Sequence, residues 1–466
     1  MVERISSKKN IIFNFIVASG ILITAIALVI TTGKKEFWYD EMATLGFMKT
    51  GVSFKEMLHY YLTIEASNLP LYQIIVRAFY ELLPATAFYV LLPSMIMTIL
   101  GEFLLVRLTD KAFGRVAAYI VLLLSFFSTT FVNRMGLLLR AYSLMFLASI
   151  FTFTMIYKLC KSDKVSDYVL FTLVLLLLVY SHYFGCLLFG MLGLGTFLLA
   201  LIKKVSWKQL LPYFIAGLLF LPWFLLAMKT RVTGVDDFWI APPTVKNVIE
   251  TIGYLLGGNI IATFLWGLAF AFCLVMIIKS KSFFSFETLV VMIPMVIIAT
   301  IFIYSHVGGS LYENRYFIVI APYLLMTIGI FFQKIFELIH NKKLAVVVYV
   351  LSGIILLATF VLMVQRCVKD MNFQYDIYGG PARYIINQGD LEDEDVLLIT
   401  RDYTDVDRIT SMGWYDYFFE RRGIKAAHVE FKDSGGGKQT ELIESYGDII
   451  NKVYIIHPII NLKPIL

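Results

Sequence analysis

Long uncharged hydrophobic runs alternate with short basic connections along most of the chain. The runs at 10–33 and 288–312, for example, contain no Asp, Glu, Lys or Arg. Each is long enough to cross a hydrocarbon core of roughly 30 Å as an α-helix, which rises about 1.5 Å per residue. Hydrophobic residues make up 59% of the chain and charged residues only 16%. The pattern is typical of a polytopic helical membrane protein.

The hydropathy pattern predicts about eleven transmembrane helices. One stretch is ambiguous, because 168–202 carries no charged residue and could be read as a single very long helix. A turn at "SHYFG" (181–185) divides it into two spans and keeps the basic connections on both sides of it on the same face of the membrane. The predicted spans are 11–31, 88–107, 116–131, 138–157, 168–181, 184–202, 209–228, 260–278, 288–305, 315–333 and 343–364.

Basic residues in the short connections predict the orientation of the spans. The basic clusters lie at 1–10, 107–115, 158–164, 203–208, 279–281 and 334–343. The positive-inside rule places all of them in the cytoplasm, so the N-terminus is expected inside and, with an odd number of spans, the C-terminus outside. The net charge of +6 is then explained by orientation and does not indicate nucleic-acid binding. Short inner loops and the lack of targeting signals favour a bacterial plasma membrane.

Three regions are expected on the outer face: the loop 32–87, the loop 229–259 and the segment after 365. The long loop 32–87 contains two amphipathic stretches, 53–62 and 71–83, that are typical of helices lying along a membrane surface. The segment 366–466 is acidic, with 17 Asp and Glu against 12 Lys and Arg.

Within this tail, β-like and helix-like runs alternate. The β-like runs are 395–400 and 452–458, and the helix-like runs are 405–423 and 438–450. This alternation predicts a small extracytoplasmic α/β domain with an accessory role, following a transmembrane domain at 1–365.

The stretch "FWYDEMATLG" (37–46) places two adjacent carboxylates, Asp40 and Glu41, directly after the first span. An ordinary solvated acidic loop explains them equally well until other features are considered. Cationic side chains also occur at predicted outer span ends, where the positive-inside rule does not expect them. They are Arg134, Arg140, His182, Arg231 and Arg315. Contact with lipid headgroups is one explanation, and binding of an anionic ligand is the other.

Several short motifs follow one another in a familiar order. They are "FWYDE" (37–41), "NLPLYQIIVRAFYELL" (68–83), "RAYSLMFLASI" (140–150), "SHYFG" (181–185), "LPWF" (221–224) and "NRYFIVIAPYLL" (314–325). Together they resemble the GT-C membrane glycosyltransferases, in particular the family 39 branch that includes protein O-mannosyltransferases and lipid A aminoarabinose transferases. The resemblance covers roughly 10–365. It implies an all-α GT-C-like fold with an outward-facing catalytic loop, and a polyprenyl-phosphate-linked sugar donor.

The chemistry of such a transfer assigns roles to the candidate residues. The acceptor hydroxyl needs a base, and Asp40 is the expected one; Glu41 orients the acceptor or assists a metal. The departing polyprenyl phosphate needs cations and hydrogen-bond donors more than a proton. The expected phosphate- and sugar-binding residues are Arg140, Tyr142, His182, Tyr183, Arg315 and Tyr316. The expected reaction is an inverting transfer to an extracytoplasmic hydroxyl on a glycan, lipid or protein.

Two other function classes remain open. A flippase or transporter of polyprenyl-linked saccharides would be favoured by charges buried in mid-span, and Glu102 is a candidate for such a charge. A receptor with an external ligand-binding tail would leave the acidic first loop unexplained. The four cysteines are scattered and indicate neither a disulfide framework nor a zinc site. No cofactor is certain, and a divalent cation at Asp40 and Glu41 stays open; membrane lipids are expected partners.

Overall fold

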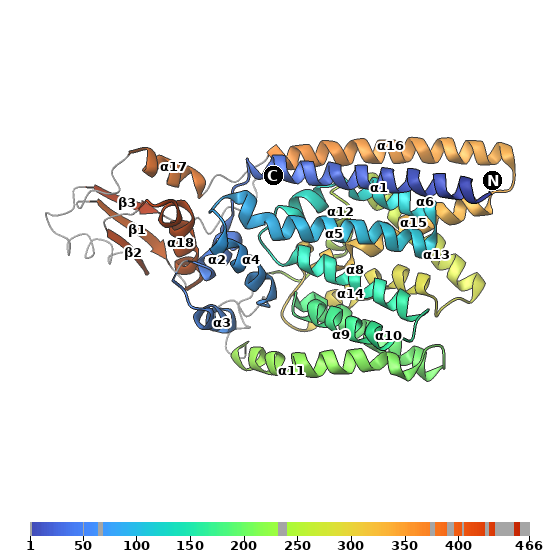
Figure 1. The fold of residues 1–466 in the computed structure, drawn as a ribbon, viewed down its shortest axis with the longest axis horizontal. Coiled ribbons are helices and arrows are strands. Elements are labelled where there is room, and N and C mark those ends of the chain that lie inside the picture. Colours follow the sequence, from blue (N-terminus) through green and yellow to red (C-terminus); the bar gives the residue numbers. More distant parts are fainter. Residues whose placement is uncertain are drawn as a thin grey trace. The chain divides into compact units, whose positions relative to one another are not determined.

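The computed structural model describes residues 2–49, 51–63, 69–231, 240–372, 378–388, 396–402, 405–424, 428–433 and 452–456. The chain divides into two compact units, which are described separately (Figure 1). We call the first the membrane unit; it comprises Met1–Thr31 and Ser94–Asn372. We call the second the loop–tail unit; it comprises Thr32–Pro93 and Phe373–Leu466.

The membrane unit is helical throughout its described residues. Its elements are α1 (Val2–Thr32), α5 (Ala87–Phe113), α6 (Arg115–Ser125), α7 (Thr129–Phe131), the π-helix η1 (Val132–Gly136), α8 (Tyr142–Leu159), α9 (Val165–Val179), α10 (Tyr183–Leu201), the 3₁₀-helix η2 (Trp207–Leu210), α11 (Leu211–Arg231), α12 (Val245–Leu255), α13 (Ile260–Ser280), α14 (Phe286–Val307), the 3₁₀-helix η3 (Asn314–Ile320), α15 (Ala321–Leu338) and α16 (Lys342–Asn372). Two helices cross the boundary between the units. The start of α5, residues 87–93, and the last residue of α1, Thr32, belong to the loop–tail unit.

The predicted spans correspond to helices of the structure. In the described part of the chain, nine helices are long and apolar enough to cross a membrane. A tenth candidate is the pair formed by Arg115–Ser125 and Thr129–Gly136, which is bent by 66°. The fifth predicted span, 168–181, corresponds to α9, an apolar helix of 15 residues that is shorter than the others. A polytopic membrane protein with a helical membrane part is therefore confirmed, while the eleventh span and the orientation stay predictions.

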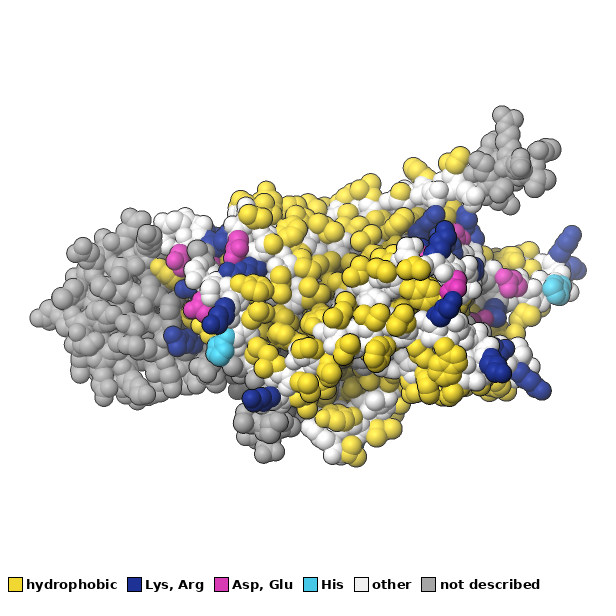
Figure 2. Space-filling view, turned by 60° about the horizontal axis from the view of Figure 1, so that its bottom comes forward, with side chains coloured by type: hydrophobic (Ala, Val, Ile, Leu, Met, Phe, Trp, Pro, Cys, Tyr) yellow, Lys and Arg dark blue, Asp and Glu magenta, His cyan; other side chains and the backbone are white. Residues whose placement is uncertain are grey.

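Helix α15 forms the centre of the membrane unit. Of its most apolar stretch 83% is buried, against 22% for α16, which presents its side chains outward. A Cβ atom at Gly329 would lie 2.8 Å from the carbonyl oxygen of Ala117, so glycine allows α15 to pack directly on α6. A helix that is apolar all round is expected at such a buried position. Figure 2 shows the complementary outer surface, where hydrophobic side chains cover the spans.

The loop–tail unit combines helices with a small sheet. Its helices are α2 (Tyr39–Phe47), α3 (Phe54–Thr63), α4 (Leu71–Leu82), α17 (Gly379–Gln388), α18 (Asp405–Phe418) and the 3₁₀-helix η4 (Glu420–Arg422). Its strands are β1 (Val396–Asp402), β2 (His428–Asp433) and β3 (Lys452–Ile456), in the order β2-β1-β3 with both pairings parallel. Helix α18 and strands β1 and β3 thus occur where the tail pattern placed them. Helix α17 and strand β2 were not predicted, and 438–450 lies outside the described residues.

Helix α2 of the first loop packs directly against α18 of the tail. A Cβ atom at Gly46 would collide with the carbonyl oxygen of Ile409, and one at Gly413 would collide with that of Met42. Glycine at both positions lets the two backbones approach closely, as small residues do at tight helix crossings. Helices α2 and α18, which are more than 350 positions apart in sequence, therefore share one packed unit.

Polar and aromatic contacts reinforce this packing. The Tyr80 hydroxyl of α4 donates a hydrogen bond of 2.6 Å to the buried Asp416 carboxylate of α18. Arg421 lies over the Tyr80 ring, 4.2 Å from its centroid, and donates to the carbonyl oxygen of Leu83. Desolvation, together with the neighbouring Asp416 charge, raises the pKa of the Tyr80 phenol, so the hydroxyl stays a donor at physiological pH.

The glycine crossing gives a stability prediction. We expect Gly46→Ala to destabilise the loop–tail unit by about 1–3 kcal/mol, because the added Cβ meets backbone that cannot move aside cheaply. Thermal unfolding and limited proteolysis of the purified protein would show a lower midpoint and faster cleavage within the tail. Gly190→Ala on α10 is the matched control, since a Cβ there meets nothing within 4 Å. Equal behaviour of the two variants would contradict the close approach.

Candidate functional site

Asp40 lies in the first turn of α2, where the helix begins after Trp38. Its side chain is half-buried, and its backbone oxygen accepts a hydrogen bond of 2.9 Å from the Thr44 hydroxyl. The unpaired N–H groups of a first turn favour a negative charge nearby. Asp40 is therefore held in the first turn of a helix, with part of its side chain accessible.

Glu41, the next residue, has a different environment. It is fully buried, and its carboxylate accepts a hydrogen bond of 3.1 Å from the backbone N–H of Trp38. The Lys35 ammonium lies 2.7 Å from the same carboxylate oxygen. Glu41 therefore caps α2, the helix that carries Asp40. The negative charge of Glu41, which a divalent cation would need, is already neutralised by Lys35. These contacts fit a positioning role better than a metal ligand.

In the membrane unit, three of the predicted binding residues lie together: His182, Tyr142 and Tyr316. The His182 ring lies 5.9 Å from the Tyr142 ring and 5.3 Å from the Tyr316 ring, measured between centroids. His182 caps α10, because its Nδ1 accepts from the backbone N–H of Phe184 at 3.2 Å. This acceptor role leaves Nε2 as the nitrogen that carries the proton in the neutral ring. Residues from α8, the α10 cap and η3 thus form one aromatic cluster.

The remaining predicted binding residues flank this cluster in sequence. Arg315 precedes Tyr316 in η3, and its guanidinium lies 5.8 Å from the centroid of the Tyr316 ring. Arg140 is 8% exposed and lies two residues before Tyr142, at the turn that begins α8. Tyr183 is half-buried and is the first residue of α10. The structure thus connects His182, Tyr142, Tyr316 and Arg315 by ring contacts and places Arg140 and Tyr183 beside them along the chain.

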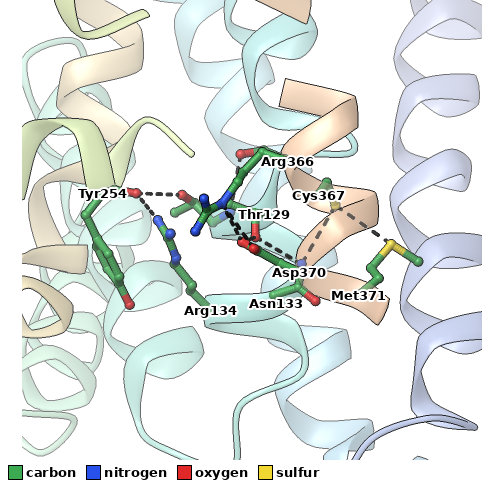
Figure 3. A network of polar contacts seen from close by, with 10 residues as sticks. Thr129, Asn133, Arg134, Tyr254, Arg366, Cys367, Asp370 and Met371 are labelled. Carbon is green, nitrogen blue, oxygen red and sulfur yellow. Dashed lines mark hydrogen bonds and ion pairs between the residues drawn. The ribbon is translucent and has the colours of Figure 1, made fainter. Parts of the chain in front are cut away.

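Another arginine that was predicted at an outer span end, Arg134, lies on η1 and contacts Tyr254 of α12. Its guanidinium lies 3.7 Å from the centroid of the Tyr254 ring and donates to the carbonyl oxygen of Tyr254 (Figure 3). Burial raises the pKa of the Tyr254 phenol, and the charges of Arg134 and Arg315 act in the opposite direction. Arg134 and Arg315, 181 positions apart, are therefore both close enough to Tyr254 to influence it.

Sequence reasoning missed a polar network that lies beside this arginine. Figure 3 shows Asp370 of α16 beside Thr129 and Arg366; Thr129 donates to its carboxylate at 2.6 Å, and Arg366 forms an ion pair of 3.0 Å with it. Asn133 donates to the Thr129 hydroxyl at 3.0 Å. The spacing of Arg366 and Asp370, four residues apart at the end of a long apolar helix, was the only signal for this network. A π-helix such as η1 frequently marks a functional site.

Three expectations are left without a structural outcome. The side chains of Glu65, a further acid considered for the site, and Arg231 lie outside the described residues. Among the residues that the structure describes, no group of three or more His, Cys, Asp and Glu could hold a metal ion. A divalent cation therefore has no assigned site, and its role is untested.

The architecture of the chain was compared with solved structures. Two crystal structures of ArnT from Cupriavidus metallidurans share it. The apo structure has a TM-score of 0.57 at 12% identity and is matched over 96% of this chain and 89% of that chain. The structure bound to undecaprenyl phosphate has a TM-score of 0.50 at 12% identity, over 88% of this chain and 75% of that chain. The likeness extends beyond 10–365, where the motifs end.

No protein-family model matches the sequence, and no curated protein matches it significantly. The shared architecture therefore rests on the structural comparison, and at 12% identity that comparison establishes the fold alone. Function has to be argued from the residues.

The contrast between the two carboxylates can be tested by stability. We expect Glu41→Gln to lower the free energy of unfolding of the loop–tail unit by about 3 kcal/mol, because it leaves the Lys35 ammonium without its buried partner. Asp40→Asn should change it by less than about 1 kcal/mol, since Asp40 is half-buried and asparagine keeps the size of its side chain and one acceptor oxygen. Chemical denaturation of the purified variants, followed by proteolysis of the tail, measures both. A larger loss in Asp40→Asn would reverse the assignment.

Proposed function

We propose that this protein is an integral-membrane glycosyltransferase that moves a sugar from a polyprenyl-phosphate-linked donor to a hydroxyl of an extracytoplasmic acceptor. The observation that supports it most directly is the meeting of Tyr142, His182 and Tyr316, which the sequence singled out in three separate regions. The fold that the chain shares with ArnT, one structure of which holds undecaprenyl phosphate, supports the donor class. The acceptor is a cell-envelope glycan, a lipid or a protein.

Asp40 is the base in this proposal. The acceptor hydroxyl gives its proton to the Asp40 carboxylate while its oxygen forms a bond to the anomeric carbon of the sugar. The bond between that carbon and the phosphate oxygen breaks, and the electron pair leaves with the polyprenyl phosphate. Attack opposite to the leaving group inverts the anomeric configuration. The step requires the carboxylate form of Asp40, because only the carboxylate can accept the proton.

The arginines hold the charge that develops on the leaving phosphate. A guanidinium offers two parallel N–H donors that match phosphate oxygens, which an ammonium cannot do. Arg315 and Arg140 flank the aromatic cluster in sequence, and Arg134 acts on the same tyrosine as Arg315. The rings of Tyr142, Tyr316 and His182 are suited to contact the sugar or the first isoprene groups. Fixed cations of this kind commonly contribute the largest part of catalysis.

Glu41 acts through Asp40 and is a positioning residue. By capping α2 and pairing with Lys35, it fixes the turn on which the base lies. No metal step is needed in this scheme, because arginines neutralise the phosphate and a carboxylate takes the proton.

One observation favours a flippase instead. Glu102 is fully buried in α5 and accepts a hydrogen bond of 2.8 Å from Ser125 of α6. Buried acids in spans often belong to transport pathways. Incubating the purified, detergent-solubilised protein with a radiolabelled polyprenyl-phosphate sugar and an acceptor fraction from the cell envelope separates the two functions. A transferase produces labelled acceptor without two compartments, and a flippase produces none.

Asp40→Asn tests the base directly. The substitution keeps size and removes the ability to take a proton, so we expect the transfer rate to fall by about 10²–10⁴-fold. Donor affinity, measured by binding of the labelled lipid-linked sugar, should stay within a factor of about two. A comparable loss of donor binding would assign Asp40 to the donor site and refute its role as the base.

The phosphate contacts can be tested with charge-conserving variants. We expect Arg140→Lys and Arg315→Lys each to raise the donor KM clearly, because lysine keeps the charge and loses the planar fork. In the double variant the costs should be non-additive, as for two residues that share one ligand group. Arg115→Lys, whose arginine pairs with Asp110, is the matched control. Unchanged donor KM in both single variants would remove Arg140 and Arg315 from the phosphate site.

A further inference from the structure

Two apolar grooves flank Arg107 at the C-terminal end of α5. The first, about 530 Å³, runs between α5 and α8. Its lining consists of Leu104, Arg107, Leu108, Lys111, Thr154, Tyr157, Lys158, Lys161 and Ser162. The second, about 580 Å³, runs between α1 and α5. Its lining consists of Asn14, Val17, Ala18, Ile21, Leu22, Ala25, Phe103 and Arg107. Arg107 is common to both.

Basic side chains gather where the first groove ends. Arg107 donates to the neutral Asn14 amide at 2.9 Å, and Lys161 donates to the Tyr157 hydroxyl at 2.6 Å. Lys161 also lies 4.1 Å from the centroid of the Tyr157 ring. Lys158 is paired with Asp167 at 2.6 Å, so one of the four positive charges is balanced. The rim of the groove is therefore positively charged, through Arg107, Lys111 and Lys161.

This arrangement matches one kind of ligand. We propose that the grooves hold an anionic glycerophospholipid, with its phosphate on Arg107, Lys111 and Lys161 and its acyl chains along the two apolar channels. Both grooves are lined by hydrophobic side chains of membrane-spanning helices, which acyl chains cover in a bilayer. Basic pockets between transmembrane helices are known to select acidic headgroups, each Lys or Arg adding to the attraction.

The lipid site is separate from the candidate phosphate cluster. Tyr142 begins α8 and Lys158 lies near its end, 16 residues later. At about 1.5 Å per residue the two are roughly 24 Å apart along the helix axis. A lipid bound at Arg107 would therefore not be the sugar donor, and its binding does not depend on the proposed transferase activity.

Native mass spectrometry of the purified full-length protein can test this. The probes are phosphatidylglycerol and phosphatidylcholine with identical acyl chains, titrated separately. We expect the anionic lipid to bind more tightly than phosphatidylcholine. A triple variant, Arg107→Gln with Lys111→Gln and Lys161→Gln, should weaken binding of the anionic lipid roughly tenfold or more. The control combines Lys279→Gln, Lys281→Gln and Lys342→Gln, which removes three charges outside the grooves and should leave binding unchanged. Equal weakening in the control, or equal affinity for both lipids, would overturn the proposal.

Two further measurements keep the test independent of the variant's folding. A photoactivatable phosphatidylglycerol bound to the unaltered protein should label peptides that contain 103–111 and 154–162, whereas even labelling of all spans would overturn the proposal. Inorganic phosphate at millimolar concentration should not displace the lipid, because the acyl chains supply much of its affinity. Full displacement by phosphate would identify a plain anion site instead.

Discussion

A backbone inside hydrocarbon has no water to bond with, so its amide and carbonyl groups must be paired within the chain. That constraint makes the described membrane unit entirely helical and confines irregular backbone to places where polar side chains support it. The break between α6 and η1 is such a place: Ser128 accepts from the backbone N–H of Thr130, and Thr129 and Asn133 join the network around Asp370. The candidate functional groups of the membrane unit therefore concentrate where regular helices stop.

The same constraint explains which parts of the structure the sequence could predict. Spans are fixed by runs of apolar residues, and these were located within a few residues because hydropathy acts locally. The outer arginines stood out because positive charge is unusual on that side. Tyr142, His182 and Tyr316 were predicted as binding residues in three separate regions, and their rings lie close together in the structure. Whether they contact a donor is a separate, chemical question.

Contacts between distant segments could not be predicted, because no local pattern encodes them. The tail was expected to form a domain of its own from 366 onward, yet α16 runs to Asn372 and the rest of the tail packs with the first loop. Glu41 and Asp40 are neighbours in sequence with the same chemistry, and only the fold reveals that one is buried on Lys35 while the other is half-exposed. Asp370, which organises the network beside Arg134, carries no motif at all.

The crossing of α2 and α18 has a consequence for the order in which the protein is made. Gly46 is translated well before Gly413, and the backbone contact between them cannot form until both have been synthesised. Helix α2, which carries Asp40, therefore reaches its final packing only after α18 has been made. Before that point the spans that precede α18 can insert one after another, while the helix with the proposed base still lacks its partner. Synthesis of α18 is thus a condition for the assembly of this unit.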